Sequence, residues 1–229
     1  MDQNKIWDAF QNDEDLLDVG FPARKRFEFL AGKISSGEIA LNIGVGKGYL
    51  EEILLHKGVD VFCLDPNRTT IELIRERLGL EEEKAQTGYS QSMPFQNVLF
   101  DVVIMSEVLE HLENVTIAET LVEVSRVLKP GGRFIGTVPA DEHLQANLVV
   151  CPHCGERFHR WGHVQSFSKE QLLDLLKQNF KNVRVRRMYY LDSSRLNWKG
   201  KISGVLKMVQ ALFGLKGNNQ NFYFEAVRL

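Results

Sequence analysis

Short apolar runs alternate with helical patterns between residues 38 and 139, and this alternation limits the possible folds of the chain more than any other feature. The apolar runs predict strands at 38–43 (EIALNI), 59–64 (VDVFCL), 84–89, 101–105 (DVVIM) and 133–138. Apolar residues at helical spacing predict helices at 47–57, 68–78 and 117–128. Strands connected through helices form parallel sheets covered on both faces. We therefore predict an α/β fold with a doubly wound, mostly parallel sheet.

The pattern changes after residue 140. Ser168 is an expected N-cap with Gln171 in the capping-box position, so a helix should run from there to about residue 180. Two further strands are expected at 183–190 and 222–229, which makes seven strands, with the last one antiparallel. We interpret 1–229 as a single domain. Three segments lie outside its main pattern: an N-terminal helical cap (1–34), an insert with cysteines and histidines (141–167) and an amphipathic insert (192–220).

The charge balance and the few cysteines exclude several classes of protein. Lys and Arg total 28 against 30 Asp and Glu, so the clustered positive field that nucleic-acid binding needs is not expected. No apolar run is long enough to cross a bilayer, and the acidic start of the chain does not resemble a secretory signal. Three cysteines without a signal indicate a reducing cytoplasm and no disulfide framework.

A glycine-rich bend follows the first predicted strand. It reads Asn42-Ile43-Gly44-Val45-Gly46-Lys47-Gly48-Tyr49 and stands between a strand and a helix, where nucleotide-type ligands bind in open α/β sheets. Glycines there let a ligand contact the backbone. Asp65 ends the second strand and can accept hydrogen bonds from two ribose hydroxyls. The alternative is a tight turn without a ligand, with Asp65 starting the turn into Pro66.

Four segments in this order resemble the motifs of class I S-adenosylmethionine (SAM)-dependent methyltransferases. They are LNIGVGKGYL, LDPN, GYSQSMPFQNVLFDVVIMSEVLEHL and RVLKPGGRFIGTVP. The resemblance implies that the glycines line the methionine part of SAM, that Asp65 holds the ribose, and that other residues border the adenine and the methionine. The implied cofactor residues are Asn42, Gly44, Gly46, Gly48, Asp65, Pro66, Tyr89, Ser90, Met93, Ser106 and Glu107.

Two positions depart from the family pattern. Asn42 stands where the family usually has an acidic residue, so it can accept a hydrogen bond but offers no charge to SAM. Tyr89 stands where the family often has Asp, and it can stack on the adenine instead. Arg24 and Arg26, on a helix predicted before the first strand, could reach the SAM carboxylate, although a solvated helix face explains them slightly better.

Methyl transfer from a sulfonium is an in-line displacement that needs alignment and exclusion of water, and a hydroxyl acceptor also needs a base. His143, in the loop after the fifth strand, is the preferred candidate base. His111 is a second candidate, although a packing role on a helix face explains it at least as well. The acceptor stays open among small molecules, saccharides and lipids, with a preference for oxygen.

The segment CPHCGERFHRWGH has the spacing C-x2-C-x4-H-x3-H. Cys151, Cys154, His159 and His163 could hold a structural zinc ion with tetrahedral geometry, and the first positions resemble a zinc knuckle. The alternative is a reduced cysteine pair with the histidines, including His153, serving as pocket or surface residues. If His163 is not a ligand, it becomes a candidate base.

Residues 202–215 carry an apolar stripe next to a basic segment with a tryptophan. Packing against the sheet edge or another subunit is favoured over contact with a membrane surface, and the oligomeric state stays open. Two other functions compete with a methyltransferase. One is a SAM-binding or zinc-stabilised interaction module without catalysis. The other is a nicotinamide-dependent oxidoreductase, which lacks support because Tyr49 replaces the third glycine of a dinucleotide fingerprint.

Overall fold

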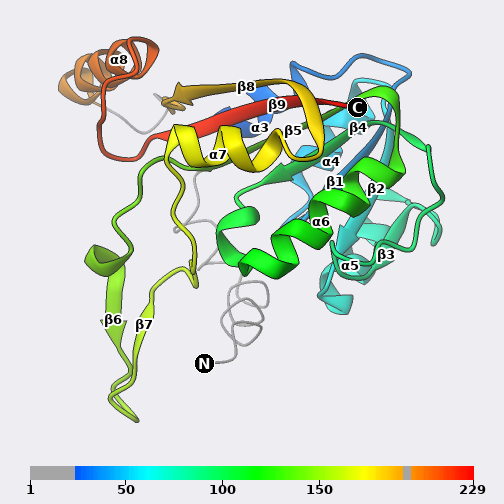
Figure 1. Ribbon diagram of the computed structural model, residues 1–229, viewed down its shortest axis with the longest axis horizontal. Helices are drawn as coiled ribbons and strands as arrows, with labels where there is room; N and C mark the ends of the chain where they lie inside the picture. Colours follow the sequence, from blue (N-terminus) through cyan, green and yellow to red (C-terminus); the bar gives the residue numbers. More distant parts are fainter. Residues whose placement is uncertain (1–23, 193–196) are drawn as a thin grey trace.

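The computed structural model describes residues 24–192 and 197–229, and within them one seven-stranded sheet forms the centre of the molecule. The strand order is β3-β2-β1-β4-β5-β9-β8 (Figure 1). The strands are β1 (Ile39–Ile43), β2 (Asp60–Asp65), β3 (Ala85–Thr87), β4 (Phe100–Ser106), β5 (Leu128–Pro139), β8 (Phe180–Met188) and β9 (Asn221–Arg228). The first five run parallel, and β9 is antiparallel to both of its neighbours. The predicted fold class is confirmed.

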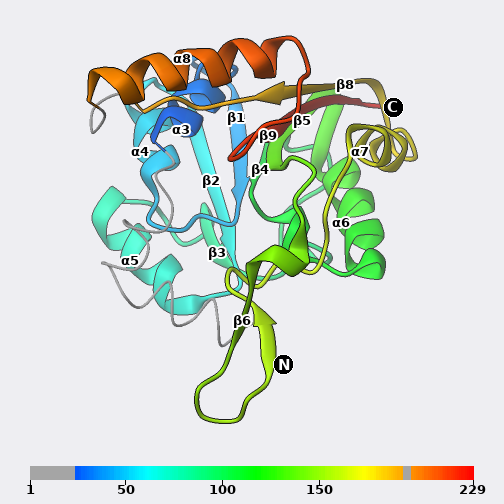
Figure 2. The same cartoon turned by 90° about the vertical axis from the view of Figure 1, so that its left-hand side faces the viewer.

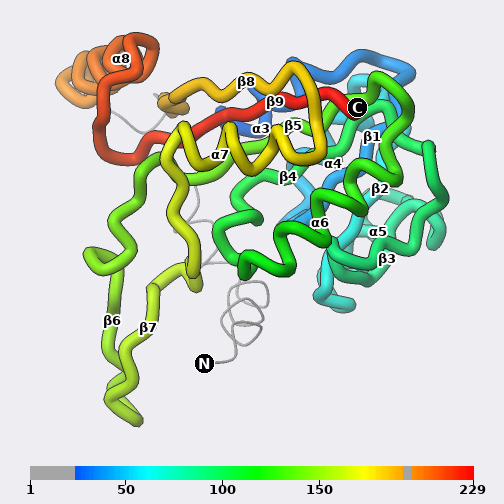
Figure 3. The backbone as a smooth tube through the Cα atoms, viewed as in Figure 1, coloured from blue at the N-terminus to red at the C-terminus, as the bar shows by residue number. Residues whose placement is uncertain are grey.

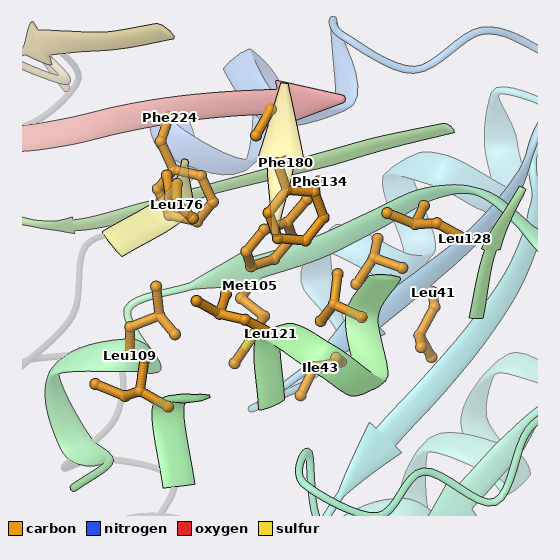
Figure 4. Packing of buried hydrophobic residues seen from close by; sticks show 14 of the residues in the cluster. Leu41, Ile43, Met105, Leu109, Leu121, Leu128, Phe134, Leu176, Phe180 and Phe224 are labelled. Atoms are coloured by element: carbon orange, nitrogen blue, oxygen red, sulfur yellow. The ribbon is translucent and has the colours of Figure 1, made fainter. Parts of the chain in front are cut away.

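Helices cover both faces of this sheet (Figure 2). The helices α3 (Arg24–Ala31), α4 (Tyr49–His56) and α5 (Arg68–Leu78) lie on one face, and α6 (Asn114–Val127) and α7 (Lys169–Leu176) lie on the other. Each face has its own apolar core. Figure 4 shows the α6–α7 side, where Phe134, Phe180 and Phe224 pack together.

Local signals explain where several helices begin and end. The Asn67 side chain accepts a hydrogen bond from the Thr70 N–H at the start of α5, and Gly79 ends that helix in a left-handed conformation. The expected capping box of Ser168 and Gln171 opens α7. This helix ends at Leu176, short of the predicted residue 180, because Phe180 already pairs with Arg228 in the sheet.

The cysteine-containing segment forms a hairpin that projects from the domain, which Figure 3 shows clearly. Its strands β6 (Leu148–Val150) and β7 (Arg157–His159) pair antiparallel. Short 3-10 turns, η1 (Leu109–His111) and η2 (Leu144–Asn147), precede α6 and the hairpin.

The amphipathic segment forms α8 (Trp198–Leu212), which lies along the edge strand β8 (Figure 2). Its small residues Gly204 and Ala211 are buried, and the ideal Cβ position of Gly204 is 2.2 Å from Leu191 Cδ1. The helix covers the sheet edge as expected, while its apolar stripe is exposed in the single chain: Val205, Leu206, Val209, Leu212 and Phe213. Packing of this stripe against another subunit stays a prediction.

Of the predicted cap (1–34), residues 1–23 lie outside the described part, as do residues 193–196 of the 192–220 insert. Among the helices that the structure describes, none combines the length and the apolar character needed to cross a membrane.

Candidate functional site

The glycine bend joins β1 to α4 in a conformation that disfavours other residues. Gly44, Gly46 and Gly48 have φ angles of 81°, 52° and 69°, which lie in the left-handed region. A Cβ on Gly44 would come within 2.6 Å of Val108 Cγ2. A Cβ on Gly46 would meet no atom within 4 Å, so this glycine faces open space. The bend therefore leaves room at its centre while its first residue packs against the loop after β4.

Asp65 ties this bend to the end of β2. Its Oδ2 accepts a hydrogen bond from the Val45 N–H at 3.0 Å, and its Oδ1 accepts one from the Asn67 N–H at 2.9 Å. The residue is 1% exposed. These two bonds orient the Asp65 carboxylate at the bend. Pro66 follows directly and is exposed.

Asn42 lies below the bend and is bound to α4. Its Nδ2 donates to Glu51 Oε1 at 2.6 Å, and both residues are buried. Asn42 Oδ1 has no partner among the described residues. Burial, as the largest cause, raises the pKa of Glu51 to about 7. The position that is usually acidic in the family is neutral here, and the buried carboxyl comes from Glu51 instead.

The three residues implied for the adenine differ in exposure. Tyr89 is 55% exposed, as a side chain available for stacking would be. Ser90 is buried, and its Oγ lies 2.8 Å from Thr120 Oγ1 of α6. Met93 belongs to the apolar core on the α6 side. The Ser90 side chain therefore points toward α6, and the Met93 side chain points into the apolar core.

Ser106 and Glu107 stand at the end of β4. Ser106 Oγ lies 2.9 Å from Thr137 Oγ1 of β5. Glu107 has a φ of 59°, an uncommon value for a residue with a side chain. Its Oε2 accepts from Asn221 Nδ2 at 3.0 Å and lies 3.7 Å from Arg26 Nη1. Its Oε1 is buried without a hydrogen-bond partner in the described part.

Arg26 differs from Arg24 in a way the sequence did not show. Arg24 is exposed and pairs with Glu28 on the helix surface. Arg26 is mostly buried, and its Nε has no hydrogen-bond acceptor among the described residues. The buried Tyr190 hydroxyl also has none there, and burial raises the pKa of Tyr190 well above its usual range. Tyr190 and Asn221 were not foreseen, because both come from the C-terminal segments that the motifs do not cover.

The two histidines proposed as bases lie in different environments. His143 is exposed at the start of η2. His111 is enclosed, and burial lowers its pKa to about 3. Its Nδ1 lies 3.2 Å from the Gly162 carbonyl oxygen, and its ring meets the His163 ring edge-on at 4.7 Å. A ring with so low a pKa is a weak proton acceptor, which makes His111 a poor general base in this environment.

The four predicted zinc ligands do not come together in one site. Within the described residues, His159 and His163 group with Glu142, and a second group joins His163 to Glu110 and His111; neither includes a cysteine. Backbone N–H groups of Trp161 and His163 donate to His159 Nδ1. The neutral His159 ring therefore carries its proton on Nε2, which removes its remaining lone pair from use by a metal. The expected set of Cys151, Cys154, His159 and His163 is therefore not assembled among the described residues, and zinc binding by it stays a prediction.

The cysteines of the hairpin should be the reactive thiols of the protein. Hydrogen bonds from the Cys154 and His153 backbone lower the pKa of Cys151, whereas burial raises the pKa of Cys63 well above its usual range. We expect iodoacetamide to label Cys151 and Cys154 in the folded protein and to leave Cys63 unlabelled, as mass spectrometry of peptides would show. Equal labelling of Cys63 under native conditions would contradict this prediction.

Comparison with known proteins agrees with this geometry. Residues 41–136 match the family described as a methyltransferase domain. A mitochondrial ubiquinone biosynthesis O-methyltransferase from Schizosaccharomyces pombe is 29% identical over 152 residues, which are 59% of this chain and 55% of that protein. A ubiquinone biosynthesis O-methyltransferase from Roseobacter denitrificans is 26% identical over 179 residues, 72% of this chain and 67% of that protein. The matches span about half the length of the first curated relatives.

The solved structures extend the likeness to the whole fold. A SAM-dependent methyltransferase from Thermotoga maritima superposes with a TM-score of 0.64 at 16% identity, covering 98% of this chain and 100% of that one. Phosphoethanolamine N-methyltransferase 2 of Haemonchus contortus, solved with SAM, gives 0.60 at 18% identity, covering 91% of this chain and 53% of that one.

The fold is shared with class I SAM-dependent methyltransferases of known structure. Residues 41–136, which contain the glycine bend, Asp65 and Glu107, are similar to a methyltransferase domain.

Proposed function

We propose that this chain transfers the methyl group of SAM to an oxygen atom of a small-molecule acceptor. The observation that carries the proposal is the open glycine bend hydrogen-bonded to a buried carboxylate, Val45 N–H to Asp65, at the end of two adjacent parallel strands. This is the place where an open α/β sheet binds a nucleoside ligand.

Several buried groups fit the parts of SAM. The centre of the bend at Gly46 admits a ligand against the backbone, and the Asp65 carboxylate bound to this bend is the kind of acceptor that ribose hydroxyls require. Asn42 Oδ1 and Arg26 Nε lack protein partners in the described part. Asn42 Oδ1 could accept a hydrogen bond from the SAM ammonium, and Arg26 Nε could donate one to the SAM carboxylate. Each pairing would satisfy a buried polar atom that is otherwise costly.

The reaction needs no covalent enzyme intermediate. A lone pair of the acceptor oxygen forms the new bond to the methyl carbon while the carbon–sulfur bond breaks and its electron pair stays on sulfur. The products are a methyl ether, neutral S-adenosylhomocysteine and the proton of the acceptor hydroxyl. The protein aligns the acceptor oxygen with the methyl group and excludes water. It must also let the proton of the acceptor hydroxyl leave, either to a base or to solvent.

Relatives favour oxygen as the acceptor atom. Two of them are named ubiquinone biosynthesis O-methyltransferases, which supports a hydroxylated ring as the acceptor class. Another relative, 28% identical over 102 residues, is a demethylmenaquinone methyltransferase from Tropheryma whipplei, whose name does not specify oxygen. An assay should therefore also look for methylation of other acceptor atoms. The cytoplasmic location and the absence of a nucleic-acid partner remain predictions from the sequence.

The first test is binding of SAM and its dependence on Gly46. SAM should raise the melting temperature of the purified chain by mass action, and NAD should not. Gly46→Ala should fold, because its Cβ meets no protein atom, but should bind SAM about 1–3 kcal/mol more weakly, roughly 5- to 150-fold, because the Cβ occupies the ligand's approach. Isothermal titration calorimetry measures this difference.

Gly79→Ala is the matched control. Gly79 also has a positive φ, 65°, and open space at its Cβ position, but it ends α5 and is not part of the bend. It should bind SAM like the wild type. Unchanged affinity in Gly46→Ala, or no SAM affinity in the wild type, would overturn the proposed site. If the chain binds SAM but forms no S-adenosylhomocysteine with any hydroxylated acceptor tested, the result would favour a SAM-binding module without catalysis.

A further inference from the structure

Glu110 is a buried carboxyl for which the methyl transfer described above has no use. It is 0% exposed, and neither of its carboxylate oxygens has a hydrogen-bond partner among residues 24–192 and 197–229. An ionised group in this position is costly unless a cation or a donor compensates it. Its nearest charged neighbours include two more carboxylates, Glu107 and Glu142, against one cation, Arg26. The local charge is therefore suited to a bound cation.

Two imidazoles converge on Glu110. One ligand atom each from Glu110, His111 and His163 lie within 4.8 Å of one another. Glu110 and His111 come from η1, and His163 comes from the segment after the β6–β7 hairpin. Metal bonds of about 2.1 Å place neighbouring ligand atoms roughly 3.0–3.4 Å apart, so the three side chains must move together when they bind an ion.

Hydrogen bonds fix which nitrogen of each ring can bind a metal. The Gly162 carbonyl, 3.2 Å from His111 Nδ1, can only accept, so Nδ1 carries the proton. Glu142 Oε2 lies 2.5 Å from His163 Nδ1 and accepts a hydrogen bond from it. In both neutral rings the lone pair is then on Nε2. A metal-binding histidine usually donates its other N–H to a carboxylate or a backbone carbonyl in this way.

The neighbouring group of Glu142, His159 and His163 does not have this arrangement. His159 accepts two backbone N–H groups at Nδ1, so its proton is on Nε2, the atom that lies 3.3 Å from Glu142 Oε1. Glu142 thus orients the His163 ring through a hydrogen bond and only approaches the His159 ring.

We propose that Glu110 and the Nε2 atoms of His111 and His163 bind one divalent first-row transition-metal ion. Two imidazoles and one carboxylate leave coordination positions open, as in catalytic metal sites. This inference deepens the proposed function, since the acceptor would occupy those positions with one hydroxyl oxygen or two adjacent ones. A metal ion held there would lower the pKa of a coordinated hydroxyl and so assist release of its proton to water. Glu107 directly follows β4 and lies in the same loop as Glu110, so the metal site is close in sequence to the end of β4.

Titration with Co²⁺ after treatment with a chelator tests the site without SAM or turnover. We expect one equivalent to bind, with Co²⁺ d–d bands in the visible spectrum and without the intense near-ultraviolet charge-transfer band of a thiolate ligand. Glu110→Gln and His163→Gln should each weaken binding at least tenfold. The double variant Cys151→Ser/Cys154→Ser and the exposed-histidine variant His143→Ala should bind like the wild type.

The melting temperature of the metal-free protein separates loss of ligands from loss of folding. Glu110→Gln removes a buried carboxyl without a partner, so its metal-free melting temperature should not fall below that of the wild type. The proposal is overturned if wild-type protein binds no Co²⁺, if Glu110→Gln binds normally, or if the cysteine double variant loses binding. Because SAM affinity is measured separately, failure here leaves the SAM site standing, and failure of SAM binding leaves the metal site standing.

Discussion

Gly136→Ala should destabilise the protein by at least about 3 kcal/mol, a large part of the roughly 5–15 kcal/mol typical of a native domain. Gly136 lies in the middle of β5, between β4 and β9. A Cβ there would stand 2.0 Å from the Met105 carbonyl oxygen and 2.5 Å from Phe224 Cζ. A side chain can rotate away, but a carbonyl within the sheet cannot, so the strands themselves would have to separate. Urea unfolding followed by circular dichroism measures the loss.

Gly37→Ala provides the comparison for this variant. Gly37 has a φ of 82° and open space around its Cβ position, so alanine there costs only the left-handed conformation, about 1–2 kcal/mol. Gly136 has no such backbone requirement, and its cost is steric. Equal destabilisation by the two variants would mean that β5 can move away from β4 and β9, contrary to the packing described here.

Glu51→Gln should stabilise the protein by up to about 3 kcal/mol at pH 8. The pKa of Glu51 is about 7 in the folded protein, against an ordinary value of 4.5, and each unit of difference corresponds to about 1.4 kcal/mol. Desolvation of the buried carboxylate is the main cause, and the Asn42 amide opposes it only in part. Glutamine has nearly the same shape and carries no charge to bury.

The sign of the pH dependence provides a second measurement. Between pH 4.5 and 7 the folded protein keeps a proton on Glu51 that the unfolded chain has released. Wild-type stability should therefore fall as the pH rises through this window, and this contribution should be absent from Glu51→Gln. At pH 5 the two proteins should differ by less than about 1 kcal/mol. Glu76→Gln, at an exposed position of α5, should change stability little at either pH, whereas an equal gain in both variants would contradict the burial argument.

Much of the fold follows from the local pattern of the sequence. Helix α5 has the predicted bounds, because Asn67 and Gly79 cap it and its apolar residues keep a helical period. The strands β1, β2 and β4 were predicted to within a residue or two, since buried parallel strands are continuous apolar runs. The end of α7 was misplaced because the partner that draws Phe180 into a strand, Arg228, lies 48 residues away. Pairing over such a distance leaves no local trace.

Part of the candidate site could likewise be predicted from the local sequence, and part of it could not. The glycine bend and Asp65 could be predicted because one turn and one strand end contain them. The environment of His163 could not, because it depends on Glu110 and Glu142, which reach it from two other loops. Counting Cys and His spacing grouped residues that are near in sequence, and the structure separates them along a hairpin. The strongest missed signal was Glu110, the second acidic residue of the SEVLEHL motif, which stands directly before His111.

The position of β9 constrains how the chain can acquire its structure during synthesis. Strand β8 pairs only with β9 within the described residues, and β9 is made more than thirty residues later. Until residues 221–228 have left the ribosome, β5 presents an open edge and the apolar face of α7 has an incomplete partner. Exposed strand edges of this kind promote aggregation, so the interval before β9 arrives should be when the nascent protein most needs a chaperone.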